Sequence, residues 1–289
     1  PSVSITEPIS SRRRAWNGTM RVLLYVSAVI ICALLVFLIG YILYRGIPNL
    51  SWEFLTSEES VINDIEGILP SIVNTVYVII ATLIIVLPLG VGSAIYLTEY
   101  ATNKKLVSII EFATETLSGM PSIIFALVGM MVFCQAFGLG TSLIAGALSL
   151  VMMTLPTIIR TTQESLKTVP QSYREGSLAL GSGKWHMIRT VVLPSSIDGI
   201  VTGCILAVGR IVGESAALLF TAGAAEVIAS SIAKAYTSNG ATLSVLLYLR
   251  AFEDGDFASA WGIGAVLLVL VLLIDLAARL AKTKLKQKQ

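Results

Sequence analysis

Residues 116–159, which decide the fold of this chain, read TLSGMPSIIFALVGMMVFCQAFGLGTSLIAGALSLVMMTLPTII. None of these 44 residues carries a charge. A helix rises about 1.5 Å per residue, and the apolar core of a bilayer takes about 20 helical residues. The stretch is therefore long enough for two membrane-spanning helices, and Phe137–Gly140 (FGLG) offers a turn between them. It predicts a tight transmembrane hairpin.

Four more apolar stretches flank this hairpin. They cover residues 22–44, 67–98, 191–220 and 257–278. Hydrophobic residues make up 55% of the chain and charged residues only 13%, with a mean hydropathy of +0.83. So little charge excludes a soluble enzyme and a disordered chain. We predict an all-α integral membrane protein with six transmembrane helices. The first stretch is longer than the apolar region of a typical signal peptide, so we expect it to be retained.

The positions of the basic residues predict the orientation. Sixteen of the 20 lysine and arginine residues lie before the first stretch, between stretches two and three, between four and five, or after the sixth. Because cytoplasmic loops are rich in Lys and Arg, both termini are predicted to be cytoplasmic. The expected organisation is a cytoplasmic tail (1–21), a first transmembrane helix (22–44), an external loop (45–66), a five-helix core (67–280) and a basic cytoplasmic tail (281–289).

One cytoplasmic loop, residues 160–190, is long enough to contain structure of its own. Ser172 and Glu175 have the spacing of a capping box, in which two side chains accept the first free amide hydrogens of a helix. Gly181 is a residue type that commonly ends helices. The loop therefore predicts a short helix at about 172–180. From composition alone, such a helix lies either on lipid headgroups or against a soluble partner.

The order of residues in this loop resembles the EAA motif of ABC-importer permeases. The motif is matched by Glu175-Gly176-Ser177, Gly181 and, nine residues later, Val191-x-Leu193-Pro194. The resemblance implies a MetI-like permease fold whose coupling helix enters a cleft of a separate ATP-hydrolysing subunit. The residues that it implies for this contact are Glu175, Gly176, Ser177, Leu178 and Gly181.

A second glycine-rich pattern in the same loop does not indicate nucleotide binding. Gly181–Lys184 (GSGK) resembles the end of a phosphate-binding P-loop, but Leu178 replaces its first glycine and Trp185 follows the lysine. We therefore expect the chain not to be an enzyme and to hold no cofactor. ATP and magnesium are expected in the partner ATPase.

Besides Asp198 near its start, the apolar stretch 191–220 contains two ionisable residues, Arg210 and Glu214. Inserting an arginine at the membrane centre costs about 2.5–3.5 kcal/mol of free energy on insertion scales, so we expect Arg210 to have a specific structural or functional role. Four residues apart, the two side chains share one face of a continuous helix and can form a structural ion pair. Alternatively, the planar guanidinium binds an oxyanion in transit, and Glu214 keeps that binding weak.

A further candidate lies at residues 118–122, which read SGMPS. Gly119 and Pro121 favour a helix break, which would expose backbone amides and the hydroxyls of Ser118 and Ser122 at a new helix start. Helix starts attract anions. A simple proline kink explains the same residues equally well.

These segments extend the resemblance. SGMPSIIF (118–125), LPTIIRTT (155–162) and RIVGESAALLFTAG (210–223) are similar to the A-type permease of the phosphate-specific (Pst) ABC importers, over roughly residues 68–280. The resemblance implies a multi-pass protein of the cytoplasmic (inner) membrane that translocates inorganic phosphate. Its implied partners are a C-type permease, two cytoplasmic ATPase subunits and an extracytoplasmic phosphate-binding protein, with membrane lipid around it and no nucleic acid. It also implies that Arg210, Glu214 and Arg160 matter for phosphate passage.

Two alternatives stay open at this point. One is an ABC permease for another oxyanion, such as sulfate or molybdate. Hydrogen phosphate keeps a proton that sulfate lacks at neutral pH. It can donate a hydrogen bond to the Glu214 carboxylate while Arg210 neutralises its oxygens, and this pair of contacts would favour phosphate. The other is a secondary anion transporter, although such proteins commonly carry internal repeats, and none is evident in this sequence.

Overall fold

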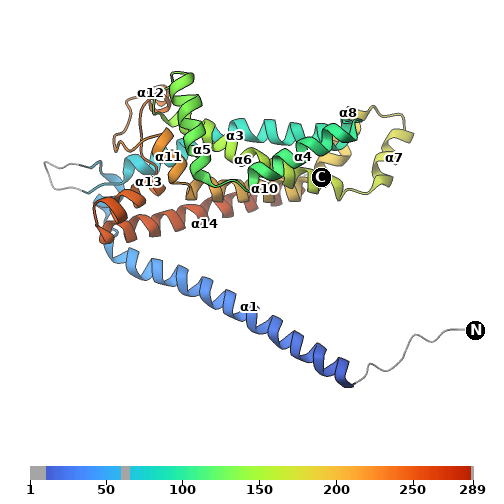
Figure 1. Ribbon diagram of the computed structural model, residues 1–289, viewed down its shortest axis with the longest axis horizontal. Helices are drawn as coiled ribbons and strands as arrows, with labels where there is room; N and C mark the ends of the chain where they lie inside the picture. Colours follow the sequence, from blue (N-terminus) through green and yellow to red (C-terminus); the bar gives the residue numbers. More distant parts are fainter. Residues whose placement is uncertain (1–10, 60–65, 288–289) are drawn as a thin grey trace, which may run out of the picture.

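The computed structural model describes residues 11–59 and 66–287, and this part of the chain folds into helices joined by turns and loops (Figure 1). The elements are α1 (Ser11–Gly46), η1 (Ile47–Asn49), α2 (Trp52–Thr56), α3 (Leu69–Ile95), η2 (Tyr96–Tyr100), α4 (Lys104–Ser118), α5 (Ser122–Gly129), η3 (Met130–Ala136), α6 (Leu143–Lys167), α7 (Gln171–Ala179), α8 (Lys184–Met187), η4 (Ile188–Val192), α9 (Leu193–Ser195), α10 (Ile197–Gly213), α11 (Ala216–Thr221), α12 (Ile232–Thr237), α13 (Leu243–Tyr248), η5 (Leu249–Glu253) and α14 (Phe257–Gln287). Parts of three predicted segments lie outside the described residues: 1–10 of the N-terminal tail, 60–65 of the external loop and 288–289 of the basic tail.

The helices provide the predicted six spans when two bent pairs are each counted as one. α1, α3 with η2, α6 and α14 are each long and apolar enough to cross a membrane. The third span consists of α4 and the helix Ser122–Ala136, bent by 101°, and the fifth consists of Lys184–Ser195 and α10, bent by 67°. The start of α1 and the end of α14 both lie toward the α7 end of the molecule, as an even number of spans requires (Figure 1).

α6 lies at the centre of the bundle. Of its most apolar window, 67% is buried, and the helix packs against α3, α4, α5 and α10. Small residues bring its neighbours close: Gly90 of α3 lies against Ile158, and Gly203 of α10 lies against Thr161, with no room for a Cβ atom at either glycine. Close backbone approach of this kind stabilises helix pairs in lipid, where the hydrophobic effect does not drive them together.

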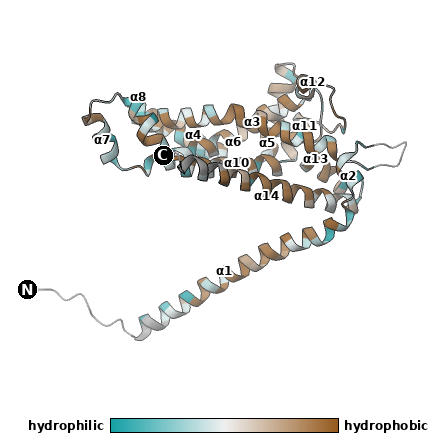
Figure 2. Ribbon diagram, turned by 180° about the vertical axis from the view of Figure 1, so that it is seen from behind, coloured by the Kyte–Doolittle hydropathy of each residue, from teal (hydrophilic) through white to brown (hydrophobic). Residues whose placement is uncertain are grey.

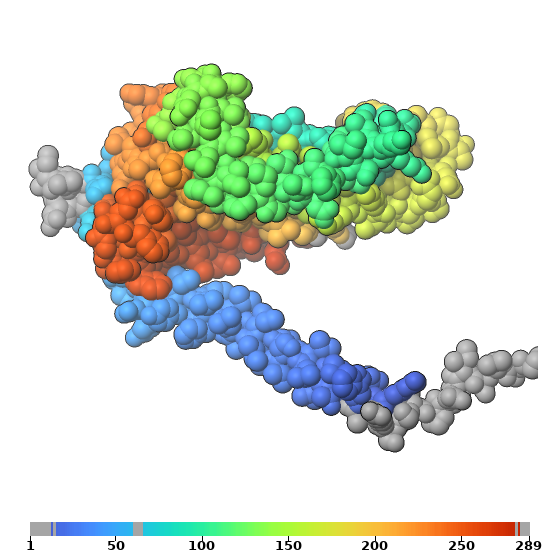
Figure 3. Space-filling view, in the orientation of Figure 1, coloured from blue at the N-terminus to red at the C-terminus, as the bar shows by residue number. Residues whose placement is uncertain are grey.

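α1 stands apart from the bundle, as Figures 1 and 3 show. None of its apolar window is buried, and most of its residues are hydrophobic (Figure 2). It meets α14 near its external end, where the Tyr41 ring lies edge-on to Trp261 at 5.4 Å between centroids. An apolar helix without a packed partner face in this chain is suited to lipid contact.

Several helices extend beyond the predicted ranges. α6 continues to Lys167, so the connecting segment starts later than the predicted loop 160–190, and α14 continues into the predicted basic tail 281–289. Charged and polar residues such as those of 160–167 are good helix formers, and helices continue through them into water. The fifth span is shifted toward the N-terminus relative to the predicted stretch 191–220, because it starts at Lys184 and α10 ends at Gly213.

Candidate functional site

The first candidate site is the break between α4 and α5. Gly119 and Met120 leave the helix, and Pro121 has the extended dihedral angles φ −59° and ψ 139° just before α5 starts. The Ser118 hydroxyl donates to the carbonyl of Glu115 at 2.9 Å, while Ser122 is half-buried in the first turn of α5. The predicted break is confirmed, and its two serines lie on opposite sides of a 101° bend.

The second candidate site is the break between α10 and α11. Arg210 lies in the last turn of α10, but Glu214 lies beyond the helix in an extended conformation, with φ −84° and ψ 116°. The prediction that the two side chains share one helix face is therefore wrong. Glu214 Oε1 instead accepts the amide hydrogen of Ala217 at 3.1 Å, and its main-chain carbonyl accepts a hydrogen bond from the Ser244 hydroxyl at 2.8 Å.

This arrangement leaves the guanidinium of Arg210 uncompensated. It is half-buried, and across residues 11–59 and 66–287 it takes part in no ion pair or side-chain hydrogen bond. The Glu214 carboxylate is hydrogen-bonded to the start of α11 and not to Arg210. A desolvated arginine without a carboxylate partner has a strong tendency to bind an anion.

The two breaks belong to one region of the bundle. α5 and α11 pack against each other. Met120 packs on the apolar cluster that includes Phe125 of α5 and Val208, Ile211 and Val212 of α10. Irregular backbone survives at membrane depth only where it is buried in protein or lines a water-filled cavity, and these two breaks pack on one apolar cluster.

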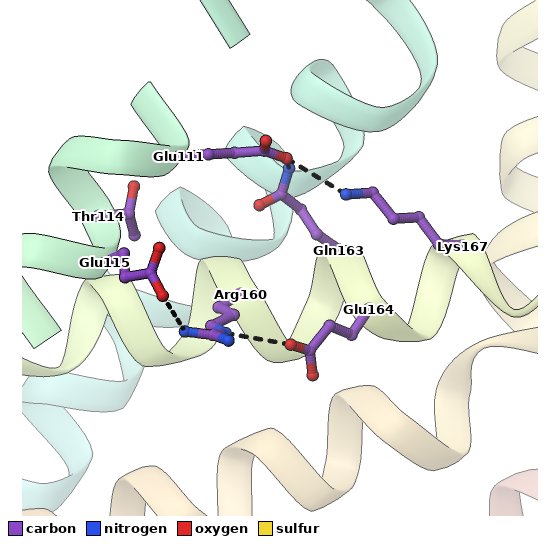
Figure 4. Close-up of a pocket in the computed structure, with 7 residues that line it drawn as sticks. All are labelled: Glu111, Thr114, Glu115, Arg160, Gln163, Glu164 and Lys167. Carbon is purple, nitrogen blue, oxygen red and sulfur yellow. Dashed lines mark hydrogen bonds and ion pairs between the residues drawn. The ribbon is translucent and has the colours of Figure 1, made fainter. Parts of the chain in front are cut away.

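Arg160 lies elsewhere, in an ion-pair network between α4 and α6 (Figure 4). Its guanidinium is 3.5 Å from Glu115 Oε1 and 3.1 Å from Glu164 Oε1, and Lys167 binds Glu111 at 3.2 Å. These residues, with Thr114 and Gln163, line a cavity of about 230 Å³. Arg160 is thus inside α6, seven residues before its end, and is already paired with two carboxylates. Its role in phosphate passage stays a prediction.

The predicted coupling helix is present as α7, with a different start. α7 begins at Gln171 behind Pro170, and no side chain caps it, so the predicted capping box of Ser172 and Glu175 is wrong. Pro170, at φ −56° and ψ 140°, directs the chain into the helix one residue earlier than predicted. Gly181 ends the turn with φ +83°, a conformation that favours glycine.

The surface of this segment is open to a partner. Glu175, Gly176 and Leu178 are exposed, and Ser177 is half-buried with its hydroxyl 2.6 Å from that of Ser182. The Leu180 side chain is 90% exposed and the Trp185 side chain 60%. Large apolar side chains exposed outside the membrane indicate a protein interface.

One polar contact in this region was not predicted. Arg174 of α7 donates to Glu99 Oε1 through Nε at 3.1 Å and Nη2 at 3.0 Å, and to the carbonyl oxygens of Val169 at 2.6 Å and Leu166 at 2.9 Å. The two charged side chains are only 12% and 6% exposed. One feature of the sequence could have indicated this contact: Glu99 is the single acidic residue between residues 67 and 110, and it lies close in sequence to the cytoplasmic Lys104 and Lys105.

A family model described as "binding-protein-dependent transport system inner membrane component" matches residues 86–287, more than half of the chain. The chain belongs to this permease family. The family and the apolar helices together place it in the cell membrane, as the sequence predicts. Members of this family are the membrane components of importers, not their catalytic subunits.

Individual relatives agree with this assignment. The permease is 43% identical to the probable ABC transporter permease YqgI of Bacillus subtilis over 198 residues, which cover 68% of this chain and 67% of the relative. It is 31% identical to phosphate transport system permease protein PstA 1 of Mycobacterium tuberculosis over 289 residues, which cover 96% of this chain and 91% of the relative. The stated resemblance to A-type phosphate permeases is confirmed.

Solved structures support the fold. A chain of the inward-facing MetNI methionine ABC transporter matches with a TM-score of 0.58 at 22% identity, covering 76% of this permease and 94% of that chain. A chain of a bacterial ABC transporter that imports the acidic polysaccharide alginate matches with a TM-score of 0.62 at 14% identity, covering 94% and 99%. The predicted MetI-like permease fold is confirmed.

At the opposite end of the permease from α7, one arginine holds three carboxylates. Arg250 of η5 is 2.8 Å from Glu59, 3.3 Å from Glu226 and 3.3 Å from Asp254. Burial, together with a hydrogen bond to Glu59, raises the pKa of Glu226 to about 7, although Arg250 opposes the shift. The cluster connects loops before α3 and after α11, and it holds more negative than positive charge.

This cluster predicts a pH-dependent stability. A carboxyl group whose pKa is higher in the folded than in the unfolded state stabilises the fold fully below the unfolded value of 4.5, and that contribution is lost as the pH rises through about 7. The variant Glu226→Gln avoids the buried charge, so we expect it to unfold at a higher temperature than the parent at pH 8. The gain should be on the order of 1 kcal/mol, because the group is partly exposed to solvent. At pH 4, below the unfolded pKa, the thermal midpoints of the two purified proteins should coincide; an equal shift at both pH values would contradict the assignment.

Proposed function

We propose that this permease is the A-type membrane subunit of an ATP-driven importer of inorganic phosphate. The observation that carries the proposal is the likeness to phosphate transport system permeases over nearly the whole chain. The uncompensated Arg210 at the break between α10 and α11 supports it, since a guanidinium matches the oxygen spacing of a tetrahedral oxyanion.

The proposed assembly contains a C-type permease as the partner of this chain, two cytoplasmic ATPase subunits and an extracytoplasmic phosphate-binding protein. α7, with its exposed Leu178 and Leu180, is the proposed contact with one ATPase subunit. ATP and magnesium bind that subunit, and this chain supplies the passage without a cofactor of its own.

In the proposed passage, Arg210 and Glu214 act on the same ion in different ways. Arg210 donates hydrogen bonds to phosphate oxygens and offsets their charge. Glu214 uses one carboxylate oxygen to hold the start of α11, and its Oε2 accepts no hydrogen bond from a described residue. The P–OH group of hydrogen phosphate can donate a hydrogen bond to that oxygen. Fully ionised sulfate has no hydrogen to donate, so the carboxylate repels it.

This chemistry predicts a change of selectivity in the variant Glu214→Gln. The amide group donates as well as accepts hydrogen bonds, so we expect sulfate to become a competitor of phosphate uptake. The expected loss of discrimination is about tenfold or more, since a hydrogen bond to a charged group contributes about 1.5–3 kcal/mol. Competition in proteoliposomes measures it, and an unchanged ratio of phosphate to sulfate would discard this role for Glu214.

The proposed function itself is tested by reconstitution. The chain is co-expressed with the proteins proposed above, and ATP hydrolysis is measured in liposomes with the loaded binding protein outside. Stimulation by phosphate, and not by sulfate or molybdate, is the expected result. Stimulation by another oxyanion alone would assign the permease to that substrate instead.

A further inference from the structure

The strongest feature that the passage does not use is the Arg174–Glu99 contact. The guanidinium of Arg174 makes four hydrogen bonds: two to Glu99 at the end of the second span, one to the carbonyl oxygen of Leu166 in the last turn of α6, and one to that of Val169 just after this helix. Both side chains are nearly buried, unlike the Lys167–Glu111 pair nearby, whose side chains are 58% and 42% exposed. An exposed pair contributes little, but removing one partner of a buried, fully hydrogen-bonded pair is costly.

A second contact joins the same two segments. The ammonium group of Lys184, at the start of α8, lies 5.0 Å from the centre of the Tyr100 ring. Tyr100 is the neighbour of Glu99 in η2, the wider helical turn that continues α3. Both ends of the segment around α7 are therefore attached to one turn of the second span, by an ion pair on one side and a cation–π contact on the other.

From this turn, α3 runs through the bundle to the opposite end of the molecule (Figure 1). There the Asn74 side chain donates to the carbonyl of Ala241 at 3.1 Å, and the Thr75 hydroxyl accepts the amide hydrogen of Leu243 at 2.9 Å. Leu243 begins α13, whose Ser244 holds the main chain of Glu214 at 2.8 Å. One helix thus connects the α7 segment with the segment that positions Glu214.

We infer that the Arg174–Glu99 pair is the link through which movement of the coupling helix reaches α3 and the passage. This inference rests on the proposed function. Through Glu99 and the Leu166 carbonyl, Arg174 attaches α7 to the second span and to α6 together, so a displacement of α7 moves both helices. Without the pair, the connecting residues 168–170 absorb the displacement, and ATP hydrolysis is no longer converted into transport. Arg174 and Glu99 are positioning residues in this account, since neither contacts the substrate.

The inference is tested in the complete reconstituted complex by measuring phosphate transported per ATP hydrolysed. We expect Arg174→Ala and Glu99→Ala each to lower this ratio at least about fivefold, which is the lower end of the effect that coupling between two sites typically has. The ATPase should still co-purify with both variants. The double variant should be no worse than the more affected single variant, because residues that act as one unit are not additive. Lys105→Ala, which removes an exposed charge from the same side of the molecule, is the matched control and should retain the parent ratio.

The possible outcomes separate this inference from the proposed function. If the parent complex transports phosphate and all variants keep its ratio, the link is wrong and the function stands. If the parent complex transports no phosphate, the proposed function fails first. Loss of the ATPase from either single variant, at an unchanged thermal midpoint of the permease, would assign the pair to docking and overturn the link. Arg174→Lys is the second variant: it keeps the charge but not the four-bond geometry, and we expect a partial loss of the ratio.

Discussion

Replacing Arg210 with alanine is expected to abolish phosphate uptake by the assembled importer. The half-buried guanidinium has no carboxylate partner among the described residues, so the ion in transit is its proposed partner. Removing one member of a desolvated charge pair costs about 2–5 kcal/mol, which corresponds to a loss of about 30-fold or more. Uptake of labelled phosphate into proteoliposomes measures the effect.

Assembly must be unchanged for this result to concern the passage. Because Arg210 makes no ion pair within the described chain, its removal leaves no buried carboxylate uncompensated. We therefore expect the variant to keep its thermal midpoint and to co-purify with the ATPase. Arg210→Lys, which retains the charge without the planar fork of donors, should keep a small part of the uptake. Uptake within twofold of the parent in Arg210→Ala would make the residue structural.

The second large effect is expected at the coupling helix. In the double variant Glu175→Ala with Gly181→Val, the ATPase subunit should no longer co-purify with the permease. Glu175 is exposed on α7, and Gly181 has φ +83°, where a β-branched residue costs about 1–3 kcal/mol and distorts the turn. Pull-down through a tag on the ATPase measures the interaction.

A charge removed elsewhere on the cytoplasmic side provides the comparison. Arg279→Ala changes an exposed residue of α14 and should leave the pull-down unchanged. If the double variant retained the ATPase as well as the control does, α7 would not be the docking element. Its exposed leucines would then be explained better by contact with lipid headgroups.

The sequence was sufficient to predict the spans and the coupling segment because these follow from local patterns. Long uncharged stretches predict membrane helices, and the glycine at position 181 correctly predicts the end of α7. The start of α7 was predicted wrongly, because Pro170 and not Ser172 precedes the first helical residue. The break at Pro121 was predicted, but its angle of 101° depends on packing against α6 and α11.

The polar contacts of the site were harder to predict because they join residues far apart in the chain. Spacing alone put Arg210 and Glu214 on one helix face, whereas Ser244 and the start of α11 hold Glu214 outside α10. Arg174 and Glu99 are 75 residues apart, and only the tertiary fold brings them together. Tertiary contacts of this kind override local spacing.

In the proposed importer, this chain is a passage without its own energy source. The most direct test compares phosphate accumulation in liposomes that contain the complete complex with accumulation in liposomes that contain this chain alone, both with ATP and the loaded binding protein. The complete complex should concentrate phosphate above its external level only when ATP is present, and the chain alone should not concentrate it. Accumulation against a gradient by the isolated chain would contradict the account.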